Sequence, residues 1–325
     1  MSINKQKYRQ LCKEEISIPV FSMDWWLDAV CGENNCDWDV ALVEKNEQIV
    51  GAIPYYIKRK AFLFNIITMP RLTQTLGPWL APLTGKYATQ LAQQKEIFTS
   101  LIEQLPPYDF FQQNFHYSIT NWLPFYWHGF TQTTRYTYVI EDLTDLDQVW
   151  NNFQSNTRRV IRKAEKEVVV RTDLDIEKFL DINTMTFQRQ GRSLPYSREM
   201  VRSIDAACLK HQARRIFFAE DNQERIHAAL YLIWDDYSAY YLMGGGNSIL
   251  RNSGAMTLLM WEAIQFASTV TKKFDFEGSM IEPIEIFFRD FGAKQIPYFQ
   301  VTHMSRGMKP LMAGRDIFKA LVKPA

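Results

Sequence analysis

The stretch KFDFEGSMIEPIEIFFRDFG, residues 273–292, carries the most specific fold signal in the chain. Its first part alternates aromatic and acidic side chains, which predicts a strand with Asp275 and Glu277 on one face. The part after the glycine predicts a helix over residues 283–291, and Gly292 ends it in the usual position past the last turn. Two acids at the end of a core strand are costly to bury unless they are paired or used. Asp275 and Glu277 are therefore candidate catalytic residues, as a general base or as groups that orient a substrate amine.

The structural alternative for this acidic pair is a salt bridge to a nearby arginine, such as Arg289. The sequence alone leaves both interpretations open.

A glycine-bearing loop lies upstream of this stretch. Residues 214–243 contain three runs rich in β-branched and aromatic residues, separated by polar turns, which predicts an antiparallel meander. We expect the meander to break at the three consecutive glycines and a second loop to lead into a helix that ends near residue 268. The N–H groups of a helix N-terminus bind anions, and glycines let a ligand approach the backbone. The candidate cofactor-binding residues are Gly244, Gly245, Arg251, Gly254 and Ala255. A plain tight turn is the alternative.

A basic helix precedes the meander. Residues 143–167 have a strongly helical composition, and their basic residues are spaced by four, so they share helix sides. A phosphate-binding stripe for a nucleotide-linked or tRNA-linked substrate is one interpretation, and a solvated charged face is the other. The candidate substrate-binding residues are Arg158, Arg159, Arg162 and Lys163.

The first half of the chain has a similar order of predicted elements. A hairpin over residues 38–57 contains Pro54, which suggests an edge or a strand end. A loop rich in glycine and proline at 72–83 and a helix at 86–105 follow, and then two strands. We therefore predict an α+β fold with mixed sheets and two similar lobes, over residues 1–141 and 142–325.

Composition excludes several classes of protein. The 325 residues have a net charge of +1, which gives no global surface for DNA or another polyanion. No apolar run reaches the ~18 residues of a membrane span, and the polar first ten residues do not resemble a signal peptide. The four cysteines (Cys12, Cys31, Cys36 and Cys208) and five histidines show no ligand spacing, so we expect no metal site. These features predict a cytoplasmic protein.

The motifs together resemble the Fem-like branch of the GNAT acyltransferase superfamily. In that branch a strand ending in Asp-Phe-x-Gly precedes a helix with Phe-Lys/Arg-x-x-Phe-Gly. Residues 274–278 match the first motif, and residues 288–292 resemble the second with one residue instead of two between Arg289 and Phe291. The loop from Arg251 to Ala255 is similar to the GNAT pyrophosphate loop, although Met256 stands where that loop has glycine or alanine. The resemblance covers roughly residues 145–305 and implies a tandem pair of GNAT-like lobes.

The resemblance also implies an activity. Fem proteins transfer an aminoacyl group from aminoacyl-tRNA to a peptidoglycan precursor, and other GNAT enzymes use acetyl-CoA. By this analogy Arg289 faces the active cleft and stabilises charge on the attacked carbonyl. We therefore expect an N-acyltransferase that acts on an amine, such as that of a cell-envelope precursor. Acyl-CoA or aminoacyl-tRNA would be its co-substrate, with no tightly bound cofactor. The alternative is a non-catalytic protein that binds a nucleotide-linked or envelope precursor.

Overall fold

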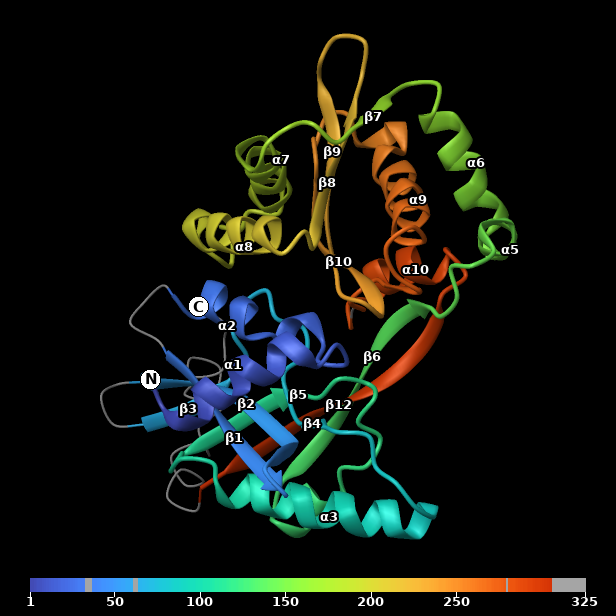
Figure 1. Cartoon of the computed structure of the whole chain (residues 1–325). Coiled ribbons are helices and arrows are strands. Elements are labelled where there is room, and N and C mark those ends of the chain that lie inside the picture. Colours follow the sequence, from blue (N-terminus) through green and yellow to red (C-terminus); the bar gives the residue numbers. More distant parts are fainter. Residues whose placement is uncertain (33–36, 61–63, 279, 306–325) are drawn as a thin grey trace. The chain divides into compact units, whose positions relative to one another are not determined.

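The computed structural model describes residues 1–32, 37–60, 64–278 and 280–305, and Figure 1 shows the path of the chain. Cys36 lies outside the described residues. Two compact units are formed. The first comprises Met1–Arg135 together with the chain from Pro297 onward, and the second comprises Tyr136–Ile296. The sequence-based division instead assigned all residues after 141 to one lobe.

The first unit is built around a mixed sheet. Its elements are α1 (Ile3–Glu14), the short 3-10 helix η1 (Val20–Ser22), α2 (Asp24–Cys31), β1 (Asp37–Lys45), β2 (Gln48–Lys60), β3 (Phe64–Thr68), β4 (Trp79–Leu80), α3 (Tyr87–Glu103), β5 (Phe110–Asn114), α4 (Leu123–Trp127) and parts of β6 (Thr131–Ile140) and β12 (Lys294–Met304). The strand order is β1-β2-β3-β5-β12, with β4 paired to β2. Neighbours are antiparallel except β3 and β5, which are parallel.

The predicted hairpin in this unit is confirmed as β1 and β2. Its turn residues Asn46 and Glu47 have φ of 50° and 63°, as a two-residue turn with both central residues left-handed requires. The expectation that Pro54 marks an edge or a strand end is wrong, because β2 has partners on both sides and continues to Lys60. On the side away from β1, β2 pairs with β4 at residues 51–52 and with β3 from residue 56 onward. Pro54 lies between these two pairings, where no backbone N–H is needed for a hydrogen bond between strands.

The second unit is a sheet with helices on both faces. Its elements are α5 (Leu146–Asn152), α6 (Ser155–Ala164), β7 (Val169–Arg171), α7 (Ile176–Arg189), α8 (Arg198–Lys210), β8 (Arg214–Glu220), β9 (Ile226–Trp234), β10 (Ser238–Gly246), η2 (Arg251–Ser253), α9 (Ala255–Ala267), β11 (Lys273–Asp275) and α10 (Glu282–Arg289). The strand order is β6-β11-β10-β9-β8-β7, antiparallel except between β10 and β11. Figure 1 shows α7 and α8 on one face and α9 on the other.

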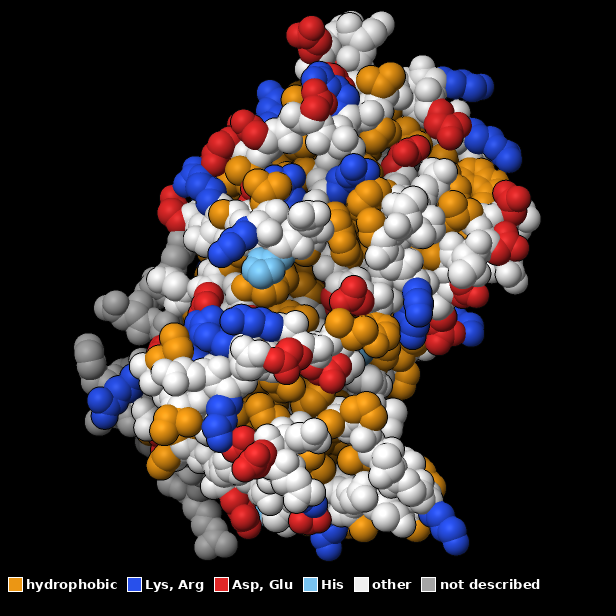
Figure 2. All heavy atoms as spheres, viewed as in Figure 1, with side chains coloured by type: hydrophobic (Ala, Val, Ile, Leu, Met, Phe, Trp, Pro, Cys, Tyr) orange, Lys and Arg blue, Asp and Glu red, His pale blue; other side chains and the backbone are white. Residues whose placement is uncertain are grey.

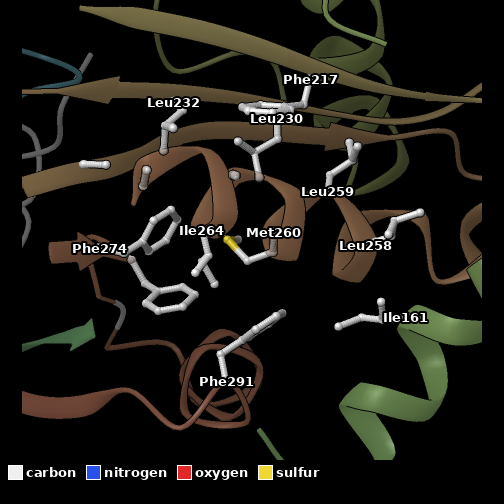
Figure 3. Close-up of a cluster of buried hydrophobic side chains, with 14 of the residues drawn as sticks. Ile161, Phe217, Leu230, Leu232, Leu258, Leu259, Met260, Ile264, Phe274 and Phe291 are labelled. Carbon is white, nitrogen blue, oxygen red and sulfur yellow. The ribbon is translucent and has the colours of Figure 1, made fainter. Parts of the chain in front are cut away.

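The core of the second unit forms around α9. Figure 3 shows Leu259, Met260 and Ile264 of this helix among apolar side chains of the sheet, including Leu230 and Phe274. All five are buried. Burial of one such side chain stabilises the folded state by about 1.5–3 kcal/mol. This packing fixes the start of α9, which the site described below uses.

A break in the predicted long helix at 143–167 lets α6 reach the same core. Phe153 and Gln154 are extended, with ψ of 146° and 145°, and they separate α5 from α6. The ring of Phe153 packs edge-on against Trp261 of α9, with ring centroids 5.3 Å apart. Burial of Phe153 therefore favours a break that helical propensity alone does not indicate.

The two units repeat one strand pattern. The order β1-β2-β3-β5-β12 in the first unit and β8-β9-β10-β11-β6 in the second each run antiparallel, antiparallel, parallel, antiparallel. A helix follows the third strand in both units: α3 in the first and α9 in the second. The predicted mixed α+β fold with two similar lobes is thus confirmed.

Candidate functional site

The parallel strands β10 and β11 separate at their carboxyl ends. They pair only from Ser238↔Lys273 to Tyr240↔Asp275, where β11 ends, while β10 continues alongside β9 to Gly246. The register of β10 against β9 shifts between Tyr241 and Met243. Ligands of open sheets bind outside the carboxyl ends of parallel strands, at such a divergence. Beyond this point β10 continues into the glycine run and the loop before α9, and Glu277 follows the end of β11.

Asp275 is the buried member of the acidic pair. Its Oδ1 accepts a hydrogen bond from the Thr137 hydroxyl of β6 and one from the Glu277 N–H at 2.8 Å. Burial raises the pKa of Asp275 to about 7, and these two hydrogen bonds oppose the rise. A carboxyl group that exchanges its proton near neutral pH suits general acid or base chemistry.

Glu277 follows on a turn that the backbone fixes tightly. Glu277 and Gly278 both have left-handed φ, of 59° and 56°. A Cβ at position 278 would lie 2.2 Å from the Tyr136 carbonyl oxygen, so only glycine fits there. Burial, and then the charge of Asp275, raise the pKa of Glu277 well above its usual range. A left-handed non-glycine residue beside a perturbed carboxyl pair is typical of functional sites.

Arg289 lies apart from the acidic pair. Its side chain is 57% exposed and forms an ion pair with Glu285 Oε1 at 3.5 Å. That oxygen also accepts from the Tyr138 hydroxyl at 2.6 Å. Thr137, which contacts Asp275, and Tyr138 are consecutive in β6 and therefore point to opposite faces of the sheet. The structure thus does not bring Arg289 to Asp275, and the salt bridge considered for the acidic pair is made with Glu285 instead.

Tyr241 is a site residue that the sequence analysis missed. It lies at the register shift of β10, and its ring packs edge-on against Phe288 at 5.9 Å. Burial raises the pKa of Tyr241, with added contributions from Tyr196 and Glu277. A Cβ on Gly244 would lie 2.1 Å from its hydroxyl oxygen. The glycine therefore makes room for this hydroxyl, and a tyrosine next to the glycine run was the available sequence signal.

The glycine run is part of β10, so the prediction that the meander breaks there is wrong. Helix α7 packs directly on these residues: a Cβ on Gly245 would lie 2.5 Å from Asn183 Cα. The Gly244 carbonyl accepts from Asn183 Nδ2, and the Gly246 N–H donates to Thr186 Oγ1, both at 2.9 Å. The absence of side chains thus serves helix packing at Gly245. A ligand role for Gly244 and Gly245 stays a prediction.

The basic helix and the second glycine loop come together. Lys163 Nζ of α6 donates to the Asn252 carbonyl of η2 at 3.1 Å. Gly254 has a φ of 78°, and a Cβ there would lie 2.5 Å from Val160 of α6. Ala255 is buried, and its N–H donates to Ser253 Oγ at 3.3 Å. The first turn of α9 is therefore held against α6, with the exposed Arg251 beside it.

The four basic residues of α6 divide between two sides. Arg158 donates to the Asn151 carbonyl at 3.1 Å, and the Arg162 guanidinium lies 5.7 Å from the Trp150 ring, so both face α5. Arg159 lies one turn before Lys163, on the side of the glycine loop. Lys163 and Arg251 are thus the cations next to the start of α9 in the described chain, with Arg159 one turn before Lys163 on α6. Phosphate oxygens are bound by this combination of cations and a helix N-terminus.

On the face shown in Figure 2, Lys and Arg side chains are interspersed with Asp and Glu. Among the described residues, no three His, Cys, Asp or Glu side chains are grouped as metal ligands would be. No helix in the described ranges is long and apolar enough to cross a membrane.

Comparison with known proteins agrees with this geometry. Residues 151–279, within the second unit, match the family model described as acetyltransferase (GNAT) domain. No curated protein matches the chain. The fold is similar to that of FemX, with a TM-score of 0.66 at 12% identity over 96% of this chain and 98% of FemX.

Two further solved structures share the fold. One is a tandem GNAT protein from the clavulanic acid biosynthesis pathway, with a TM-score of 0.52 at 9% identity over 92% of this chain and 93% of that one. The other is L-PGS from Bacillus licheniformis, with a TM-score of 0.53 at 10% identity over 95% and 96% of the two chains. Residues 151–279 thus match a GNAT domain within a fold similar to that of tandem GNAT proteins, and the resemblance to the Fem-like branch is confirmed for the fold.

Proposed function

We propose that this chain is an N-acyltransferase that moves an acyl or aminoacyl group to an amine of a cell-envelope precursor. Acyl-CoA or aminoacyl-tRNA serves as the donor. One observation carries the proposal: Lys163 contacts the η2 loop that contains Arg251 and leads from the end of β10 into α9, while β10 and β11 diverge beyond Tyr240 and Asp275. The similarity of the fold to that of FemX supports the choice of the Fem-like branch.

The donor would bind through its phosphates. Both donor types carry phosphate groups, and Arg159, Lys163 and Arg251 supply positive charge where the N–H groups of α9 begin. The donor carbonyl would then lie toward Tyr241 and Glu277, at the carboxyl ends of the two parallel strands. Fixing both reactants in this way supplies much of the rate enhancement in such transfers.

The transfer itself needs a proton acceptor. The amine nitrogen attacks the donor carbonyl carbon, a C–N bond forms, and the C–S bond of a thioester or the C–O bond of an aminoacyl ester breaks. Glu277, whose Oε1 is buried, takes the proton from the amine when it is ionised. Asp275 accepts from the Glu277 N–H and positions it. The Tyr241 hydroxyl donates a proton to the departing sulfur or oxygen.

A donor-binding experiment tests the proposal. We would measure the affinity of acetyl-CoA and of aminoacyl-tRNA for the wild type and for Lys163→Glu and Arg251→Glu. Loss of a charge-assisted contact costs about 1.5–3 kcal/mol, or roughly 10- to 150-fold in affinity, and exposure of these side chains favours the lower end. Arg162→Glu is the matched control, because it makes the same charge change on the α5 side of the same helix.

Transfer is then followed by release of free thiol or deacylated tRNA in the presence of amines. Turnover with either donor supports the enzyme. If neither donor binds, while a nucleotide-linked precursor raises the melting temperature, the non-catalytic binding protein is the correct interpretation.

A further inference from the structure

The first unit contains a pocket of its own. About 380 Å³ in volume, it is lined by residues of the loop around β4, by one side of α3, and by the loop after β5. This volume lies at the low end of the ~300–1,000 Å³ that is typical of small-molecule sites. Backbone hydrogen bonds hold its wall in place: the Leu76 N–H donates to Asn114 O at 2.7 Å, and the Ala81 N–H donates to Val50 O at 3.1 Å.

The position of the pocket matches that of the proposed donor site in the other unit. β3 and β5 are the parallel pair of the first unit, as β10 and β11 are of the second. In the first unit the pocket is lined by residues that follow β3 and β5 and by residues of α3. In the second unit the proposed site uses the loop after β10, the start of α9 and Glu277 after β11. The two places are thus topological equivalents, and ligands are expected at both.

The charge of the two places differs. Lys163 contacts the loop before α9, Arg251 belongs to that loop, and Arg159 lies one turn away on α6. In contrast, no Lys, Arg, Asp or Glu lines the pocket in the described part of the first unit. A phosphate or a carboxylate would lose hydration there without a Lys or Arg counter-ion, which is costly, and His116 is the one described lining side chain that could carry positive charge. The pocket therefore favours an uncharged ligand.

The polar side chains of the pocket are amides, hydroxyls and the imidazole of His116, whose Nδ1 is hydrogen-bonded to the Ser118 hydroxyl at 2.8 Å. Gln90 and Gln94 lie four residues apart on α3, so their side chains are neighbours. Gln94 Oε1 accepts from Asn121 Nδ2 at 3.0 Å, and Gln90 Nε2 donates to the Gly85 carbonyl at 2.9 Å. Within the described residues this leaves the Gln94 amide N–H groups as donors and the Gln90 carbonyl oxygen as an acceptor.

Apolar surface accompanies this amide pair. Pro78, Trp79 and Leu83 line the same pocket, and Trp79 is held by a hydrogen bond from its Nε1 to Ser17 Oγ at 2.9 Å. A sugar ring presents hydroxyl groups that both donate and accept, and C–H faces that pack on apolar side chains. A peptide would instead use a strand edge or a longer groove. We propose that this pocket binds a neutral saccharide unit.

Saccharide binding belongs to the first unit and does not rest on the proposed transfer reaction. The full chain would be titrated with N-acetylglucosamine, cellobiose and glucosamine 6-phosphate, and binding followed by saturation-transfer NMR and calorimetry. We expect the neutral sugars to bind and the phosphorylated one to bind at least tenfold more weakly. Gln94→Ala should weaken the neutral sugars by about 3- to 10-fold, the value of one hydrogen bond.

Gln93→Ala is the matched control, since it makes the same change on the same helix outside the pocket lining. Absence of binding by both neutral sugars, or equal effects of Gln93→Ala and Gln94→Ala, would overturn the inference. Tighter binding of N-acetyl-alanyl-alanine amide than of either sugar would also overturn it, in favour of a peptide. Donor binding is measured separately, so loss of the proposed reaction alone leaves the saccharide site intact.

Discussion

Replacement of Asp275 by asparagine should make the second unit more stable at alkaline pH. The side-chain amide oxygen of the Asp275→Asn variant can still accept from Thr137 and from the Glu277 N–H, so the fold is kept. The variant loses only a carboxyl group that is 2% exposed. Because burial disfavours the ionised form, the wild type holds this group at a free-energy cost when the pH is high.

The magnitude follows from the pKa of Asp275. Burial raises this pKa from 3.8 to about 7, and each pH unit of difference is worth about 1.4 kcal/mol. Between these two values the folded chain binds more protons than the unfolded chain. The free energy of unfolding of the wild type should therefore fall by about 4 kcal/mol as the pH rises from 4 to above 7. The raised pKa of Glu277 acts in the same direction.

Urea denaturation at pH 4.5 and at pH 8 tests this difference. Labelling of Cys208, which is fully buried in α8, identifies the transition of the second unit. Asp275→Asn should remove most of the fall in stability between the two pH values. Asp236→Asn, at an exposed turn of the same unit, should keep it. Identical pH dependence in the wild type and in Asp275→Asn would refute the reasoning about burial.

Three further variants test the site. Tyr241→Phe should lower kcat by about 10²-fold with little change in KM, because a general acid acts only in the transition state; equal kcat in steady-state assays would exclude that role. Arg289→Ala should retain turnover within a few-fold, since Arg289 contacts Glu285 instead of the acidic pair, and loss of turnover in a folded variant would restore the role expected from the family. Gly245→Ala should lower the free energy of unfolding by about 1–3 kcal/mol through overpacking against α7, whereas Gly246→Ala, whose nearest contact is 3.5 Å, should cost less than about 1 kcal/mol in the same urea experiment.

Local patterns in the sequence predicted much of the second unit. The meander, the helix that follows the glycine loop, and the strand and helix within residues 273–292 all rest on periodicity over neighbouring residues, and the structure contains each of them. The carboxyl pair was also found in this way, because a buried acid is visible as an acid within an apolar strand. Its raised pKa is a consequence of burial, which only the folded chain determines.

Long-range packing explains what the sequence did not predict. The three glycines read as a loop, yet pairing with β9 and close contact with α7 hold Gly245 in a strand. The family resemblance placed Arg289 in the active cleft. Its position in the structure depends instead on α10, which packs on the face of β6 that presents Tyr138. The partner of β12 in the first unit is β5, which lies almost two hundred residues earlier, and no local pattern indicates that pairing.

The pairing of β12 with β5 has a consequence for the synthesis of the chain. The ribosome completes β5 at residue 114, but its partner ends at residue 304. About 190 residues separate them, which take roughly 10–40 s to translate at ~5–20 residues/s. During this time one edge of β5 lacks its final neighbour, and an exposed edge strand can pair with another chain. Nascent chains of this protein should therefore depend on chaperones that shield the first unit until translation has passed residue 304.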